Sequence, residues 1–178
     1  MKQKRKLFLN VKGLTVSAML VAMSVIIGIF CKNYLNFGGG LFRVTFENLP
    51  ILLSGIMFGP IVGGLVGAAS DLVSYLMSNQ IYPPNLIVTV GAGLVGICSG
   101  TVSKYLIKRN GTAQIVVAGA LSHLIGSMVV KSIGLYQYYG ALVLWRIPLY
   151  LVIAALEIFV LCMLYRRKSF QRLLKEVQ

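Results

Sequence analysis

The chain has 178 residues, of which 57% are hydrophobic and 12% are charged, and its formal net charge is +13 at pH 7. Soluble domains are about half apolar and about a quarter charged, so this composition excludes an ordinary water-soluble domain and favours an integral membrane protein. The basic residues do not indicate nucleic-acid binding, because they gather at the two ends of the chain and in one loop, as they do in the cytoplasmic flanks of membrane helices.

The apolar segments predict the membrane helices in chain order. A spanning helix needs about 20 predominantly apolar residues. One long apolar stretch precedes residue 32 and three follow residue 85. Leu49–Met77 fits either one long helix or two short ones split at Gly59-Pro60, a pair that favours a turn, and the distribution of positive charge decides for two. We therefore expect an all-α membrane protein with one domain, residues 1–178, folded as a compact bundle of six transmembrane helices. The expected helices span residues 14–32, 45–58, 60–78, 85–107, 113–135 and 141–166.

The distribution of positive charge supports six helices and sets the expected orientation. With six helices and a cytoplasmic N-terminus, 13 of the 17 Lys and Arg residues face the cytoplasm, whereas with five helices only 7 of them do. Cytoplasmic loops carry an excess of these residues, so six helices are preferred. We expect a multi-pass protein of the bacterial cytoplasmic membrane with both termini in the cytoplasm.

Few charged residues remain outside the basic flanks, and most fall toward the outer ends of the helices. Arg43, Glu47 and Asn48 immediately precede an apolar run, so we expect them at its outer end. Ionisable residues at membrane depth are costly and usually face a cavity or a partner. An alternative explanation for the cations is interfacial anchoring, but the acids Glu47 and Asp71 gain nothing from headgroups. We therefore expect an outward-facing cavity, with cations for an anionic ligand and acids for a donor-rich one.

Helical spacing places several of these residues on shared faces. His123, Ser127 and Lys131 recur every four residues, and Asp71 and Tyr75 have the same spacing, so each set lies on one side of its helix. On its own, His123 is more typical of a hydrogen-bonded packing residue than of a ligand contact.

Aromatic residues and two contrasting loops mark the same end. Many of the aromatic residues fit an aromatic belt at the membrane interface, and some would also suit stacking on a flat conjugated ligand. Tyr82-Pro83-Pro84-Asn85 predicts a stiff turn that shapes a pocket wall. Phe37-Gly38-Gly39-Gly40 predicts a flexible loop, which we expect to gate the cavity.

No motif indicates an enzyme, a cofactor or a metal site. The chain has one histidine, three scattered cysteines and none of the HExxH, GxSxG or P-loop patterns. Gly91–Gly96 matches GxGxxG, but it lies within an expected membrane helix rather than in the strand–turn–helix unit that binds dinucleotides. Uphill transport by this chain would therefore need an ion gradient or a partner subunit.

Several motifs together resemble the S components, the substrate-binding membrane subunits, of energy-coupling factor (ECF) vitamin transporters. The motifs are R-x-T-F-x-x-x-P at Arg43–Pro50, S-G-I-M-F-G-P at Ser54–Pro60 and G-x-x-S-D-L at Gly67–Leu72. The likeness is greatest to the folate-specific family, in which the fifth helix ends in a serine-rich polar segment and the sixth opens with an arginine. In this chain those features correspond to Ser127–Ser132 and Arg146.

The resemblance implies a subunit that captures folate from outside and delivers it to one transmembrane coupling protein and two ATPases. An A-x-x-x-A strip in the first helix, Ala18 and Ala22, would help to dock these partners, although small residues at this spacing also fit packing within the chain. An S component for another vitamin, such as pantothenate or a thiamine precursor, is an alternative. So are a stand-alone exporter and a purely structural subunit.

The resemblance also implies roles for individual residues. Arg43, Lys131 and Arg146 would bind the ligand's carboxylates or fix the loops around them. Asp71, or failing that Glu47, would accept hydrogen bonds from the pterin ring. The residues expected to stack on the ligand or to complete the site are Tyr75, Tyr82, Trp145, Asn85 and His123.

Overall fold

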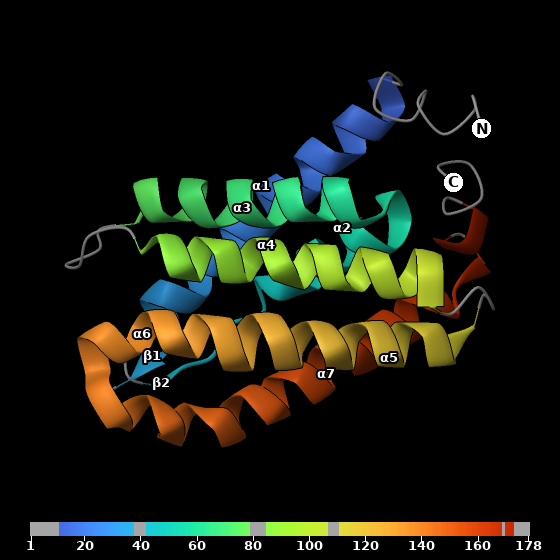
Figure 1. Ribbon diagram of the computed structural model, residues 1–178. Helices are drawn as coiled ribbons and strands as arrows, with labels where there is room; N and C mark the ends of the chain where they lie inside the picture. Colours follow the sequence, from blue (N-terminus) through green and yellow to red (C-terminus); the bar gives the residue numbers. More distant parts are fainter. Residues whose placement is uncertain (1–10, 38–41, 79–84, 107–110, 169, 173–178) are drawn as a thin grey trace.

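The structure is a computed structural model that describes residues 11–37, 42–78, 85–106, 111–168 and 170–172 (Figure 1). For residues 36, 37, 42 and 43 it describes the backbone alone. The helices of the described residues make six passes through the bundle, which confirms the fold expected from the sequence.

Each pass consists of one helix or of several helical segments in series. The elements in chain order are α1 (Val11–Tyr34), β1 (Asn36–Phe37), β2 (Phe42–Arg43), α2 (Asn48–Phe58), α3 (Pro60–Leu76), α4 (Leu86–Thr101), the π-helical η2 (Val102–Leu106), α5 (Thr112–Ser122), the π-helical η3 (His123–Val130), α6 (Lys131–Tyr139), the 3₁₀-helical η4 (Gly140–Arg146) and α7 (Ile147–Tyr165). The strands β1 and β2 are antiparallel, with Asn36 opposite Arg43 and Phe37 opposite Phe42.

Three helical stretches of the described chain are long and apolar enough to cross a membrane. They are Val11–Tyr34, Leu86–Leu106 and Thr112–Tyr165. The last has 54 residues and would measure about 80 Å if straight, which far exceeds the roughly 30 Å of a bilayer core. It folds back on itself at η4, so that α7 returns alongside α5 (Figure 1). This stretch therefore supplies two antiparallel passes.

The turn at Gly59-Pro60 separates two shorter apolar helices. Gly59 has φ of +92°, a conformation that side chains disfavour, and Pro60 opens α3, where its missing N–H costs no helical hydrogen bond. With 11 residues, α2 rises only about 16 Å, roughly half the thickness of a bilayer core. The N-terminus of α2 therefore lies well inside the bundle, far from this turn.

Glycines bring α3 and α4 into close contact. A Cβ on Gly96 would overlap the carbonyl oxygen of Gly63, and a Cβ on Gly67 would overlap that of Ala92. The GxGxxG sequence thus lies inside α4 and serves helix packing. Buried apolar residues of α2, α4, α5 and α7 complete one core cluster: Ile51, Leu52, Ile56, Val95, Ile115 and Leu161.

Candidate functional site

A buried lysine joins the N-terminal end of α2 to the continuous helical pass formed by α5, η3 and α6. The Nζ of Lys131 donates a hydrogen bond to Oδ1 of Asn48 at 2.9 Å and lies 3.5 Å from Oε1 of Glu47. Asn48 in turn donates to the Oγ of Ser127 at 3.5 Å. Lys131 is 5% exposed and Glu47 is 8% exposed. Because a buried charge needs both a counter-charge and hydrogen bonds, these four residues, the Lys131 cluster, satisfy one another.

Small residues on neighbouring helices make room for this cluster. A Cβ on Gly91 of α4 would lie 2.8 Å from Cγ of Lys131, so a side chain there would collide with the lysine stem. A Cβ on Gly28 of α1 would lie 2.9 Å from Oε2 of Glu47. Ser24 of α1 also holds this region by donating to the backbone carbonyl of Glu47 at 2.7 Å. The glutamate is therefore confined against α1 on one side and the lysine on the other.

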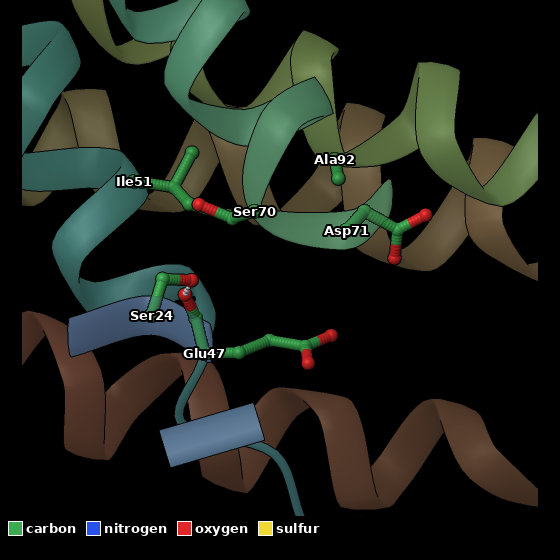
Figure 2. A pocket seen from close by; sticks show the side chains of 6 residues that line it. All are labelled: Ser24, Glu47, Ile51, Ser70, Asp71 and Ala92. Carbon is green, nitrogen blue, oxygen red and sulfur yellow. Dashed lines mark hydrogen bonds between the residues drawn. The ribbon is translucent and has the colours of Figure 1, made fainter. Parts of the chain in front are cut away.

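A narrow cleft, with no room for a water molecule between its side chains, adjoins Glu47 (Figure 2). Residues from α1 to α4 and from the turn before α2 line it: Ser24, Glu47, Ile51, Ser70, Asp71 and Ala92. Figure 2 shows Glu47 and Asp71 approaching from different elements, with both carboxylates extending to the same side. Thr89 of α4 donates to Oδ2 of Asp71 at 2.7 Å, which fixes that carboxylate. Two acids thus offer hydrogen-bond acceptors at one cleft.

The structure places Glu47 and Asn48 deeper than the sequence indicates. We expected them at the outer end of a helix spanning 45–58, but residues 44–46 are not helical and α2 begins only at Asn48. Asp71 lies eleven residues beyond Pro60, about 16 Å along α3, and the N-terminal end of α2 is a similar distance from Gly59. The two acids therefore meet at a similar depth in the middle of the bundle.

His123 and Glu157 form a second buried contact, between η3 and α7. Nε2 of His123 and Oε2 of Glu157 lie 2.8 Å apart, an ion-pair distance, although they lack the alignment of a directional hydrogen bond. The His123 side chain is 3% exposed and that of Glu157 is fully buried. Neither residue lines the cleft.

Other expected site residues occupy different positions. Arg146 is buried at the end of η4, just before α7, with its guanidinium 5.4 Å from the ring centroid of Tyr150. Asn85 accepts a hydrogen bond from the backbone N–H of Ile87, which caps α4, and donates to the carbonyl of Gly134 at 2.6 Å. Its amide therefore joins α4 to α6.

The aromatic residues divide between the bundle and its surface. Tyr75 is half-buried on α3, whereas Trp145 is 70% exposed and lies outside the Lys131 cluster. Tyr82 and Gly38-Gly39-Gly40 fall outside the described residues. The backbones of Phe37 and Arg43 belong to β1 and β2.

Several polar residues of α1, α3 and α4 near the two acids were not assigned to the site from the sequence. Lys32 donates to the Oγ of Ser74 at 2.8 Å and to that of Ser78 at 3.4 Å. Ser70, Ser74 and Ser78 recur every four residues, a spacing that could have shown a polar face on α3. Thr89 carries no comparable pattern, because its partner Asp71 is on another helix.

The expected docking strip can also be located in the structure. Ala18 and Ala22 are both exposed on α1, and docking at this strip stays a prediction. Among the residues that the structure describes, no group of three or more His, Cys, Asp or Glu side chains could hold a metal ion.

A family model identifies the family of the chain. The family model "ECF transporter, substrate-specific component" matches residues 12–171. The folate transporter FolT of Clostridium novyi is 30% identical over 80 residues, which cover 43% of this chain and 46% of that protein. An uncharacterized protein of Mycoplasma pneumoniae is 33% identical over 95 residues, 53% of this chain and 19% of that protein. The chain thus matches less than half the length of each of these relatives.

A solved structure has the same fold. The crystal structure of FolT bound with folic acid superimposes with a TM-score of 0.63, covering 86% of this chain and 90% of that chain. The two chains are 21% identical, so this similarity establishes the arrangement of the helices.

Proposed function

Because the chain belongs to the substrate-specific components of ECF transporters, which are multi-pass membrane proteins, we propose that it is the folate-binding subunit of such a transporter. The observation that carries the proposal is the meeting of a buried cation and two acids beside a cleft inside an apolar bundle. The similarity to the folate transporter of Clostridium novyi supports folate as the vitamin.

The chemistry of folate fits these groups. Its flat pterin head carries several N–H donors, and its glutamate tail carries two carboxylates. Asp71 and Glu47 supply acceptors for the pterin donors, and Lys131 supplies a charge-assisted hydrogen bond for a tail carboxylate. Arg146, which is also buried, and Arg43 are further candidates for the second carboxylate.

Binding of a molecule as large as folate requires the cleft to widen. Pockets for drug-sized ligands measure roughly 300–1,000 Å³, whereas the space between the side chains of this cleft is too tight to hold even a water molecule. Lys131 already has Glu47 as a counter-charge, so an incoming carboxylate shares or displaces that partner. We infer that ligand entry separates the elements that line the cleft.

The same proposal includes an ATP-driven partner module. No ATP-binding motif is present in the chain, and its family is a transporter component rather than a known class of enzyme. We assign energy coupling to one transmembrane protein and two ATPases, with the exposed Ala18 and Ala22 on the docking face. The excess of basic residues at both chain ends favours cytoplasmic termini.

Mass spectrometry of small molecules extracted from the purified chain tests the ligand. We expect folate or a reduced folate, and saturable binding of added folic acid but not of pantothenate or thiamine. Recovery of a different vitamin that binds with higher affinity than folic acid would refute folate specificity. Accumulation of folate in liposomes that contain this chain without any ATPase would instead identify a stand-alone transporter.

A further inference from the structure

The buried contact between His123 and Glu157 lies outside the proposed cleft and has no role in the function proposed above. Glu157 is 0% exposed and His123 is 2% exposed, so both are removed from lipid and water. Their contact links η3 to α7, the helix that returns alongside α5.

Stability alone does not account for such a pair. Desolvating two ionisable groups costs several kcal/mol each, and replacing a buried pair by well-packed apolar residues is often neutral or stabilising. Ionisable residues inside membrane proteins are usually functional for this reason. The contact between His123 and Glu157 therefore calls for a functional explanation, and the segment that it holds in place supplies one.

The segment that begins at His123 leads directly to the Lys131 cluster. Ser127 lies in the middle of η3, and Lys131 directly follows its last residue. Ser127 and Lys131 both contact Asn48, and Lys131 also pairs with Glu47. One end of the segment is thus held by α7 and the other by the N-terminal end of α2.

The winding of this segment makes its rotation important. A π-helix is rare, and its turns frequently occur at functional sites. Because π-helical and α-helical turns contain different numbers of residues, a return of η3 to α-helical winding would rotate Lys131 relative to His123. The position of Lys131 therefore depends on η3 being fixed at both ends.

We propose that Glu157 is a positioning residue for the binding site. By holding His123, it fixes the rotation of η3 that presents Ser127 and Lys131 to Asn48 and Glu47. The relevance to folate rests on the proposed function, whereas the positioning rests only on contacts within the chain.

The test replaces both partners with apolar residues of similar size. In His123→Leu/Glu157→Leu, no charge is left buried without a partner, so we expect the melting temperature to stay near that of the original chain. We expect the Kd for folic acid to rise at least tenfold. Gln114→Leu is the matched control. Gln114, on α5, is likewise a buried polar residue, and it donates hydrogen bonds to Ser103, which is not part of the Lys131 cluster. This control should leave the Kd within threefold.

A second readout needs no ligand. In a chain with Cys31, Cys98 and Cys162 replaced by alanine, Asn48→Cys and Ser127→Cys place two thiols where side chains now meet at 3.5 Å. We expect their oxidation to a disulfide to slow at least fivefold when His123 and Glu157 are both leucine. An unchanged disulfide rate would overturn the positioning role. Failure of the original chain to bind folic acid would overturn the proposed function and leave the disulfide result decisive.

Discussion

Replacing Lys131 by methionine removes the charged end of a buried side chain and keeps its unbranched apolar stem. The ammonium group now lies 2.9 Å from Oδ1 of Asn48 and 3.5 Å from Oε1 of Glu47. A hydrogen bond to a charged group contributes about 1.5–3 kcal/mol. If Lys131 makes one such bond to a folate carboxylate, its loss raises the Kd roughly 10- to 150-fold.

The same substitution removes the counter-charge that Lys131 supplies to the carboxylate of Glu47. Two unit charges 3.5 Å apart attract by about 5 kcal/mol at an effective dielectric constant of about 20, and removing one partner of a buried pair costs about 3–5 kcal/mol. We therefore expect Lys131→Met to lower the free energy of unfolding by about 3 kcal/mol. Glu47→Gln/Lys131→Met should be more stable than Lys131→Met alone, because the neutral glutamine leaves no buried carboxylate charge at position 47.

Thermal unfolding and calorimetric titration with folic acid, both in detergent, measure these effects. Lys12→Met is the control, because Lys12 is exposed in the first turn of α1 and should change neither quantity. Stability losses of Glu47→Gln and Lys131→Met that simply add in the double variant would refute the pairing. A Kd for Lys131→Met equal to that of the original chain would remove Lys131 from the ligand site.

Three further substitutions test other parts of the account. Asp71→Asn should weaken folic acid binding by roughly 10-fold or more at unchanged expression, because a donor group replaces one acceptor oxygen; titration with an unaltered Kd would exclude Asp71 from the site. Gly96→Ala should destabilise the fold by about 1–3 kcal/mol in thermal unfolding, because its Cβ overlaps the carbonyl of Gly63. Gly93→Ala, whose Cβ meets its nearest atom at 3.4 Å, is the control, and equal melting temperatures for the two variants would contradict the close packing. Trp145→Phe should change the Kd less than threefold because Trp145 is 70% exposed, and a tenfold loss of affinity would show that it contacts the ligand.

The helix count could be predicted because it depends on local sequence. Apolar runs, the Gly59-Pro60 pair and the distribution of Lys and Arg together identify six passes without knowledge of tertiary contacts. The beginning of α2 could not be predicted in this way. Thr45 and Phe46 lead into the apolar run that begins at Leu49. Hydropathy alone does not distinguish a buried non-helical segment from the first turn of a helix.

The candidate site, too, could be predicted only in part from the sequence. The four-residue spacing of His123, Ser127 and Lys131 predicts a shared face, and all three are buried in the structure. Their partners Asn48 and Glu157 lie on other helices, and no local pattern indicates which helices become neighbours. No local pattern indicates the π-helical winding of η3 either.

A structure of the chain determined with folic acid bound tests the central claim most directly. We expect ligand density among α1, α2, α3 and α4, with the pterin within hydrogen-bonding distance of Asp71 or Glu47 and a tail carboxylate at Lys131. Density confined to the outer surface, with the Lys131 cluster and the cleft unchanged, would contradict the claim that these buried groups form the binding site.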